Sequence, residues 1–446
     1  MQRCHNTPNK WGALAFACLL MGCTAPPAPS INAPHLWTDS DGRTVLHRGM
    51  NLNNQAKRAS DGYTHGRSTT ELAHLVSHGF TAIRLLTFWE AVEPERGVYD
   101  EAYLDQLRSD IAALEALGLD VIVDLHQDVY GEGFSSTGFP DWTCAAENYE
   151  NFVASEVDWF FNYFNQGVLD CFDNFWADDA LQADYAAMTA HLVNAVHESP
   201  AVVAIDVINE PFWGTMSIED HETLTLPRFY ETVVETVREV DEDIRIWLAP
   251  SAGSNITYEA LLDLDALRTS APIASAPHFY PPNIEVDAPY DDDFTEEAYI
   301  LDGLADHAND YGVPLVVGEF GIWTDYGNES DYVQNVLRHI EARGNHSFYW
   351  SYDAGSRVLN DDGSPGSLLE AYLAPFPHRI PGVFSHVDLD GTAHFDLSGM
   401  GELVFMTPQG AGDCEIEGAD VLSLDFQAPR LTAQLEGDGP VSALCW

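Results

Sequence analysis

The stretch AIDVINEPF, residues 204–212, begins as an apolar strand and ends in polar residues. Pro211 lacks the N–H group that a sheet ladder needs, so the strand cannot continue through it. Just before this proline, an amide and a carboxylate stand side by side at Asn209 and Glu210. Parallel α/β sheets place binding residues at the carboxyl ends of their strands, so this ending indicates such a sheet.

On either side of this stretch, short apolar strands alternate with amphipathic helices. Because about eight strand–helix units are the order of a (β/α)8 barrel, we predict this α/β fold, the TIM barrel, for residues 35–375. A doubly wound open sheet is the alternative, although no glycine-rich phosphate loop follows the first strand. The expected strands are Thr44–Asn51, Ala82–Leu86, Asp120–Leu125, Val202–Ile208, Arg245–Ala249, Ile273–Phe279, Leu315–Gly318 and Ser347–Ser351. The expected helices include Tyr103–Leu117, Tyr185–His197, Phe229–Glu239, Thr295–Tyr311 and Tyr332–Arg343.

After residue 375 the pattern changes to short segments in which apolar and polar residues alternate between Gly and Asp turns. Alternation with a period of two is typical of strands with one buried face. We therefore predict a small all-β sandwich for residues 376–446. We expect it to pack on the barrel, and carbohydrate binding is the alternative role.

The chain of 446 residues carries a formal net charge of −52, from 19 Lys and Arg against 71 Asp and Glu. Binding a nucleic acid requires a basic patch, so we exclude nucleic acids as partners. The acidic and lysine-poor composition fits a salt-rich habitat or an extracytoplasmic location. Simple solubility is the alternative explanation.

The N-terminus is typical of an export signal. Its apolar run, residues 11–20, is too short to span a bilayer as a mature helix. The following LMGC resembles a bacterial lipobox, so we predict a lipoprotein signal peptide at 1–22, a lipid on Cys23 and a tether at 23–34. The membrane anchor would hold the protein at the cell envelope, and Thr24 favours the outer membrane of a Gram-negative cell. An ordinary signal peptide is the alternative.

Four cysteines remain after the signal segment and the lipidated residue are set aside. Four cysteines allow three pairings. Pairing Cys144 with Cys171 and Cys414 with Cys445 would close two local loops in an oxidising compartment. The sequence has no CxxC motif and no His/Cys cluster, so we expect no metal.

Two glutamates, Glu210 and Glu319, end two of the expected strands. Hydrolysis of a glycosidic bond uses one protonated carboxyl and one ionised carboxylate, which retaining enzymes hold about 5–5.5 Å apart. The pair therefore predicts a glycosidase. Other strand ends carry polar or aromatic residues, of which His126 and His278 could instead be structural. Arg84 lies within the second expected strand, and the strand ends carry Asp124, His126, Asp128, Asn209, His278, Tyr280 and Trp350.

These motifs resemble those of glycoside hydrolase family five, and within it those of the endoglycoceramidases. The resemblance covers most of the chain, and its specific part is DLHQD followed by GFPDW, a pair that plain cellulases lack. Family members also carry a C-terminal β-sandwich. The motifs are GMNLNN, AIRLLTFWEAVEPERGVYDEAYL, DLHQDVYGEGF, GFPDW, DNFW, VINEPF, HFYPP, GEFG and YWSYD.

The resemblance implies roles for individual residues. Glu210 would be the acid/base and Glu319 the nucleophile. Arg84 would keep Glu319 ionised, Tyr280 would donate a hydrogen bond to it, and Asn209 would hold the sugar 2-hydroxyl. The residues expected to contact substrate are Lys57, Arg84, Asp124, His126, Trp176, Asn209, His278, Tyr280 and Trp350.

Lys57 and the segment 130–176 carry further predictions. Lys57 is the only lysine after the signal, and the family has a sugar-contacting lysine in this region; a chance surface lysine is the alternative. Residues 130–176 hold 14 aromatic residues in 47. They would form either a local core around the Cys144–Cys171 loop or an apolar groove for a lipid aglycone.

The resemblance therefore implies a monomeric, cofactor-free retaining endo-β-glycosidase that releases an intact glycan from the ceramide of a glycosphingolipid. The first alternative is a β-glycosidase acting on glucosylceramide, a sterol glucoside or a soluble β-glucan. An alternative of another class is a catalytically silent lipoprotein that binds glycans or glycolipids. The presence of both glutamates and of Tyr280 argues against silence.

Overall fold

A computed structural model describes residues 36–446, except for 53–56, 58, 157–158, 268–271, 282–283, 285–288, 325, 354–355, 361–363 and 411. The predicted signal peptide, Cys23 and the tether lie outside the described residues. In the part that is described, no helix is both long enough and apolar enough to cross a membrane.

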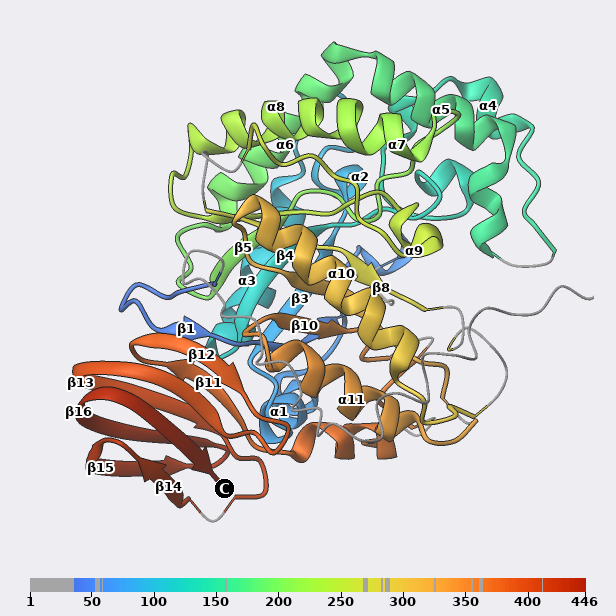
Figure 1. The fold of residues 1–446 in the computed structure, drawn as a ribbon. Coiled ribbons are helices and arrows are strands. Elements are labelled where there is room, and N and C mark those ends of the chain that lie inside the picture. The colour runs from blue at the N-terminus through green and yellow to red at the C-terminus, as the bar shows by residue number, and fades with distance from the viewer. Residues whose placement is uncertain are drawn as a thin grey trace, which may run out of the picture. The chain divides into compact units, whose positions relative to one another are not determined.

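Within the described chain, nine strands form a sheet of parallel neighbours in the order β7-β6-β5-β4-β3-β2-β10-β9-β8. Figure 1 shows strands of this sheet, among them β3, β4 and β5, with helices around them. The two outermost, β7 (Ile273–Ser275) and β8 (His278–Phe279), are successive parts of one predicted strand. A bridge from Ser275 to Leu315 and the pairing of β8 with β9 close the ring, which confirms the eight-stranded barrel. The remaining strands are β2 (Arg48–Leu52), β3 (Ala82–Thr87), β4 (Asp120–Leu125), β5 (Val202–Asp206), β6 (Arg245–Leu248), β9 (Val316–Phe320) and β10 (His346–Tyr349).

The helices of the barrel bury one face each. In α3 (Glu101–Ala116), buried side chains recur at helical spacing, at Leu104, Leu107, Ile111 and Leu114. Asp100 caps this helix by accepting hydrogen bonds from two backbone N–H groups of its first turn. The other α-helices are α1 (Thr69–Ser77), α2 (Trp89–Val92), α4 (Ala146–Glu150), α5 (Gln166–Ala177), α6 (Asp179–Val196), α7 (Ile218–Asp220), α8 (Leu226–Arg238), α9 (Ser254–Thr257), α10 (Thr295–Tyr311) and α11 (Glu329–Glu341).

The prediction of a single strand at Thr44–Asn51 is wrong. Thr44–Val45 form β1, which pairs antiparallel with β11 (Phe376–Ile380) of the C-terminal sheet, whereas β2 begins at Arg48 and enters the barrel. Every residue of both strands is buried. Because both sheets bury these residues, the apolar pattern carries no mark where the chain passes from one sheet to the other.

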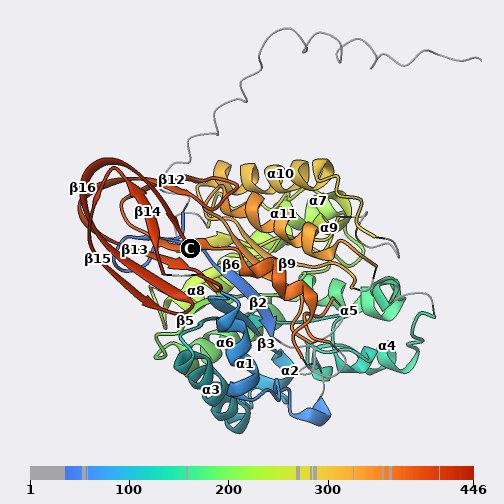
Figure 2. The same cartoon turned by 90° about the horizontal axis from the view of Figure 1, so that it is seen from below.

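The C-terminal region is all-β, as predicted, and its strands belong to one antiparallel sheet. Its two longest strands, β13 (Ala393–Met406) and β16 (Arg430–Cys445), pair along their whole length and run through both halves of the sheet (Figure 2). One half adds β11 and β15 (Asp420–Gln427) to them, and the other adds β12 (Val383–Val387) and β14 (Cys414–Glu417). Gly399 and Gly439, both at positive φ, lie where the halves meet, since glycine allows the strong local bending required there.

Both predicted disulfides are confirmed. Cys144 is bonded to Cys171 of α5, and Cys414 of β14 is bonded to Cys445 of β16. The first closes part of the aromatic segment 130–176. The second joins two neighbouring strands near the C-terminus.

Candidate functional site

Every second residue of a barrel strand points inward, so the inward-pointing side chains form layers, and two of these layers underlie the site. The lower layer is apolar, and it alternates alanines with large residues. Gly49 completes it on β2, because a Cβ there would lie 2.1 Å from the Phe348 ring. The apolar layer contains Ala82, Ile122, Ala204, Trp247, Ala274, Val316 and Phe348. Two residues further along β2, β3, β4 and β5, the chain places Asn51, Arg84, Asp124 and Asp206.

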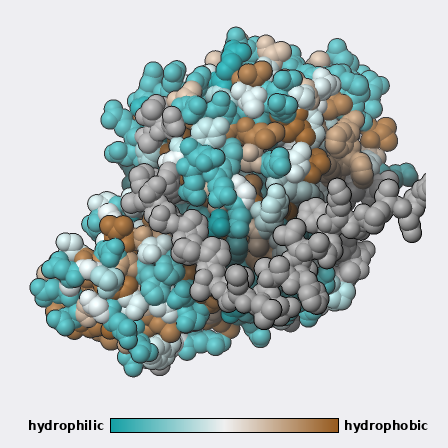
Figure 3. All heavy atoms as spheres, in the orientation of Figure 1, coloured by the Kyte–Doolittle hydropathy of each residue, from teal (hydrophilic) through white to brown (hydrophobic). Residues whose placement is uncertain are grey.

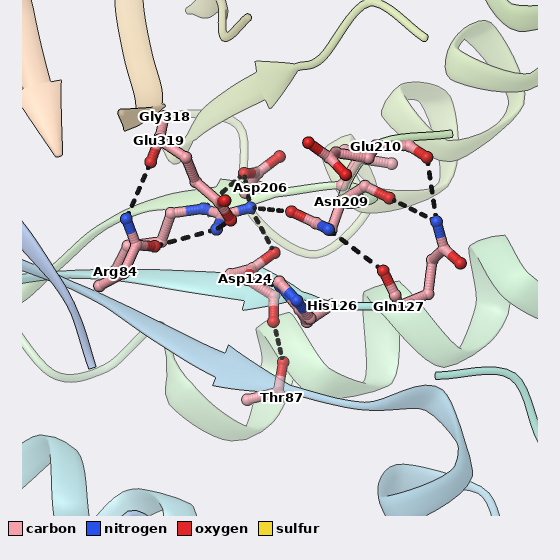
Figure 4. A network of polar contacts seen from close by, with 12 residues as sticks. Arg84, Thr87, Asp124, His126, Gln127, Asp206, Asn209, Glu210, Gly318 and Glu319 are labelled. Atoms are coloured by element: carbon pink, nitrogen blue, oxygen red, sulfur yellow. Dashed lines mark hydrogen bonds and ion pairs between the residues drawn. The ribbon is translucent and has the colours of Figure 1, made fainter. Parts of the chain in front are cut away.

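The fully buried Arg84 joins this second layer to the strand ends (Figure 4). Its Nη1 donates to Glu319 Oε1 at 2.7 Å, and its Nη2 donates to Asn209 Oδ1 at 2.9 Å. Its other partners within the layer are Asp206 Oδ2 at 2.9 Å, Asp124 Oδ1 at 2.9 Å and Asn51 Oδ1 at 3.0 Å. The structure thus brings together Arg84, Asp124, Asn209 and Glu319, as the sequence predicted.

Three carboxylates surround this single guanidinium, so the cluster is electrostatically unbalanced. Burial alone would lower the pKa of Arg84, but Asp124, Asp206 and Glu319 together raise it. Burial raises the pKa of Asp206 to about 6, and Asp124 adds to the rise although Arg84 opposes it. Burial therefore disfavours the charged form of Asp206 within the cluster.

Glu319 lies near the end of β9 with only 5% of its surface exposed. Arg84 holds its Oε1, and the Tyr280 hydroxyl donates to its Oε2 at 3.0 Å. His278 Nδ1 lies 3.6 Å from the same Oε2. A carboxylate that receives a cation and a hydroxyl donor is stabilised in its ionised form.

Glu210 is held by its backbone and by its carboxylate. Its φ is +41°, a conformation that non-glycine residues rarely adopt, and Gln127 Nε2 donates to the carbonyls of Asn209 and Glu210 at 2.9 and 3.0 Å. Asn255 Nδ2 and His278 Nδ1 lie 2.9 and 2.8 Å from Oε1 of the carboxylate. Within the described part of the chain, these contacts are made to Oε1, which leaves Oε2 to exchange a proton with a ligand.

The two glutamates face each other across His278. One carboxylate oxygen of each glutamate and one ring nitrogen of His278 all lie within 4.8 Å of one another. Burial alone would lower the pKa of His278, but Glu319 and Glu210 raise it. The short separation matches the arrangement of a retaining glycosidase, whereas inverting enzymes leave about 6.5–9.5 Å for a water.

A second polar group lies beside this pair. His126 Nδ1 lies 2.8 Å from Asp124 Oδ2, and its ring is stacked parallel to Trp350 with centroids 5.6 Å apart. Lys57 contacts Asp128 and lies over the Trp350 ring, 4.4 Å from its centroid. Burial alone would raise the pKa of Asp128, but Lys57 and His126 hold it well below its ordinary value. Lys57 thus lies between the Asp128 carboxylate and the Trp350 ring.

Trp176 lies in the core beneath the Glu210 loop. Its Nε1 donates to the Phe212 carbonyl at 2.8 Å, and its ring packs against His221 and Phe229. Only 7% of its surface is exposed. This leaves little of the ring to serve as the predicted sugar platform, and its main contact supports the chain just after Glu210.

The aromatic segment 130–176 divides into a buried and an exposed part. Phe134 is buried, and Trp142 packs on Trp89 at 5.3 Å between ring centroids, so both belong to a local core. Trp159 and Phe161 are 52% and 57% exposed. They lie in the 3-10 helix Trp159–Phe164, and Figure 3 shows hydrophobic residues gathered on the same side of the molecule as α5 and α9.

Sequence reasoning missed four residues that complete the site. Asn51 and Asp206 had a detectable signal, because each stands two residues after a residue of the apolar layer, as do Arg84 and Asp124. Gln127 lies within DLHQD, but its contact with the Glu210 backbone depends on how two loops meet. Asn255 is in α9, in a stretch with no recognised motif.

Comparison with known families gave one match that covers most of the barrel. The family model described as cellulase, glycosyl hydrolase family 5, matches residues 38–356. Endoglycoceramidase I from Rhodococcus hoagii is 27% identical over 377 residues, which cover 77% of this chain and 71% of that protein. A glucosylceramidase from Cryptococcus neoformans is 28% identical over 256 residues, which cover 43% of this chain and 34% of that protein.

Solved structures of endoglycoceramidase II from Rhodococcus sp. are similar along nearly the whole chain. Its complex with ganglioside GM3 has a TM-score of 0.83 and 27% identity, covering 93% of this chain and 100% of that one. The structure of its lactosyl-enzyme intermediate has a TM-score of 0.81 and 27% identity, and the match covers 92% of this chain and 99% of that one.

The Arg84 cluster generates a stability prediction. Arg84→Met leaves three carboxylates buried around an apolar side chain, so we expect the free energy of unfolding at pH 7.5 to fall by about 3–5 kcal/mol. Without the cation, the pKa values of these carboxyls rise above their unfolded values. Their protonated forms are then favoured in the folded state, so the deficit should shrink as the pH is lowered toward 5. Urea unfolding at the two pH values measures this.

A second substitution provides the control. Adding Asp206→Asn to Arg84→Met removes one of the unpaired charges, so it should restore part of the lost stability at pH 7.5. A deficit that is the same at both pH values and is unchanged by Asp206→Asn would contradict the electrostatic account.

Proposed function

Because the chain belongs to glycosyl hydrolase family 5, we propose that it is a retaining endo-β-glycosidase that cleaves the bond between the glycan and the ceramide of glycosphingolipids. The observation that carries the proposal is the pair of facing glutamates in different environments. Arg84 and Tyr280 bind both oxygens of Glu319, whereas among the described residues Asn255 and His278 both contact Oε1 of Glu210. The pair thus suits one ionised nucleophile and one carboxyl that exchanges a proton.

In the first step, Glu319 attacks the anomeric carbon, and Glu210 gives its proton to the departing ceramide oxygen. A covalent glycosyl-enzyme forms at Glu319. In the second step, Glu210 takes a proton from a water that attacks the same carbon, and Glu319 is released. Two inversions leave the anomeric configuration unchanged. The lactosyl-enzyme intermediate captured for endoglycoceramidase II supports this route.

The polar side chains near His126 would hold the sugar. Lys57 and Asp128 provide a cation and an anion that can bind hydroxyl groups, and Trp350 provides an aromatic ring beside them. Asn209 donates one amide hydrogen to the Gln127 carbonyl at 3.1 Å, which leaves its second hydrogen for the sugar 2-hydroxyl.

The exposed aromatic residues would hold the lipid. Phe164 is 47% exposed, and its ring contacts those of Phe212 and Trp213 at centroid distances of 5.6 and 6.4 Å. Phe212 and Trp213 follow Glu210 by two and three residues. The apolar surface at Trp159, Phe161 and Phe164 therefore connects with the acid/base, where the aglycone leaves.

A β-glycosidase acting on glucosylceramide is the second candidate, supported by the similarity to the fungal glucosylceramidase. The two candidates differ in the products they release. Offering lactosylceramide, a ganglioside, glucosylceramide and a cello-oligosaccharide side by side should give intact lactose and the intact ganglioside glycan. Release of glucose from glucosylceramide alone would favour the second candidate.

We also propose that Cys23 carries a lipid that anchors a monomeric enzyme to the bacterial cell envelope, on the outer membrane if the cell is Gram-negative. The LMGC motif supports the anchor. Thr24 supports outer-membrane sorting, because the residue after the lipidated cysteine is not aspartate. An anchored enzyme would act on substrates that reach the cell surface.

The catalytic roles predict a difference in azide rescue. Glu319→Gln should abolish turnover and keep the fold, because no nucleophile remains. Glu210→Ala should lose turnover of natural glycolipids but regain it on an activated aryl glycoside when azide is added. Because the glycosyl-enzyme at Glu319 is intact in that variant, the product should be a β-azide, identified by NMR. An α-azide product would instead indicate that Glu210 is the nucleophile and Glu319 the acid/base.

The aromatic surface predicts selective loss on lipid-linked substrates. Replacing either Trp159 or Phe161 by serine should lower kcat/KM for a ceramide-linked glycan about tenfold, since each aromatic contributes about 1–2 kcal/mol of apolar burial. The same glycan on a small aryl group should be turned over normally. Leu422→Ser, at an exposed apolar residue on β15, is the control and should leave both rates unchanged. Equal losses on both substrates would remove the aglycone role.

If a lipid on Cys23 anchors the protein, incorporation of labelled palmitate should depend on the sulfur of that residue. Bacterial cells grown with labelled palmitate should incorporate label into the full-length wild-type protein but not into Cys23→Ser. The wild-type protein should also fractionate with membranes. Unlabelled wild-type protein in the culture supernatant would indicate an ordinary signal peptide.

A further inference from the structure

The hairpin of β12 and β13 places two imidazoles over one carboxylate. His386 and His394 are register partners, so their side chains share one face of the hairpin. Their rings are stacked, with centroids 4.3 Å apart and 8° between the planes. Both Nε2 atoms point to Asp388: His394 Nε2 lies 2.8 Å from Oδ2, and His386 Nε2 lies 3.5 Å from Oδ1.

We propose that His386, Asp388 and His394 bind a divalent transition-metal ion of the zinc type. One ligand atom from each of the three residues lies within 4.8 Å of the other two, so small side-chain rotations can bring all three to one ion. Two imidazoles and a carboxylate are ligands that Zn²⁺ and similar ions accept in a tetrahedral site, with a water in the fourth position. Mg²⁺ and Ca²⁺ prefer all-oxygen ligands, so they should bind poorly there.

Neighbouring groups hold the ligands in place. Ser385 Oγ lies 2.9 Å from His386 Nδ1 and can accept its hydrogen, which leaves the lone pair on Nε2 for a metal. The turn that carries Asp388 is closed by its own backbone, because Asp388 N–H donates to the Thr392 carbonyl at 2.9 Å. The N–H of Gly391 donates to the Asp388 carbonyl at 2.9 Å. The carboxylate therefore stays near both rings.

The position of the hairpin indicates a structural role. In the described chain, β12 pairs with β13 alone, so it is held to the sheet along one edge. An ion bound by His386 of β12 and His394 of β13 would tie these strands together. The net charge of −52 favours any cation near the surface, and the imidazoles would select a transition metal from among them.

Calorimetric titration of the full-length protein with Zn²⁺, after treatment with a chelator, tests the proposal. Excess Mg²⁺ is added to occupy carboxylate-only sites, and the pH is kept near 7.5, where ordinary imidazoles are largely neutral. We expect one Zn²⁺ to bind at the hairpin, and His386→Gln or His394→Gln each to weaken that binding at least tenfold. These side chains are partly exposed, so the variants should unfold at the wild-type temperature.

A matched control separates this site from ordinary surface histidines. His339 Nε2 lies 2.7 Å from Asp302 Oδ1, but its pair has a single imidazole, so His339→Gln should bind Zn²⁺ like the wild type. Binding that all three variants retain or lose alike would overturn the proposal, as would equally tight binding of Mg²⁺. Substitution by Co²⁺ provides a second readout. If bound Co²⁺ absorbs visible light without a thiolate charge-transfer band, the result supports a site at His386, Asp388 and His394. A thiolate band that persists in His394→Gln would overturn the proposal.

Discussion

A single buried cation holds the interior of the barrel together. Arg84 binds groups from four strands and from the loop after β5, so its guanidinium fixes the positions of Asn51, Asp124, Asp206, Asn209 and Glu319 relative to one another. A guanidinium suits this place because its planar fork offers five donors and stays charged. Burying charges is costly, and the ion pairs and hydrogen bonds to Arg84 offset part of that cost. The nucleophile is therefore part of the packed interior.

The acid/base is positioned by a different kind of constraint. Glu210 lies beyond the end of its strand, in a backbone conformation that costs on the order of 1–3 kcal/mol and persists only where the surroundings impose it. Gln127 supplies that restraint from the loop after β4, and its own Oε1 accepts from the Tyr130 N–H at 3.1 Å. Asn255 and His278 then fix one carboxylate oxygen. The nucleophile is set by a layer of the barrel, and the acid/base by the loop after β4, by α9 and by His278 of β8.

This difference explains what the sequence could predict. The positions of Arg84, Asp124 and Glu319 were predictable, because an apolar strand with a period of two fixes the side of the strand on which its polar residues lie. Asp206 follows the same rule and could have been found by aligning the strands. Asn255 could not, since its contact with Glu210 depends on the path of a loop that no local pattern specifies. The sequence pattern did not show that the chain passes from one sheet to the other after Val45, because every residue of β1 and β2 is buried.

In the aromatic segment 130–176, too, the local sequence does not specify which residues are buried, and the exposed ones bear on how the substrate binds. Composition alone could not separate Phe134, which is in the core, from Phe161, which is exposed, because both lie in the same aromatic-rich stretch. In three dimensions, polar groups follow strands β2 and β4, at Lys57 and His126. Trp213 follows Glu210 and contacts the exposed ring of Phe164. The bond to be cut in a glycosphingolipid joins a polar glycan to an apolar lipid. An enzyme whose surface changes from polar to aromatic at its proton donor can bind both parts and place that junction at Glu210.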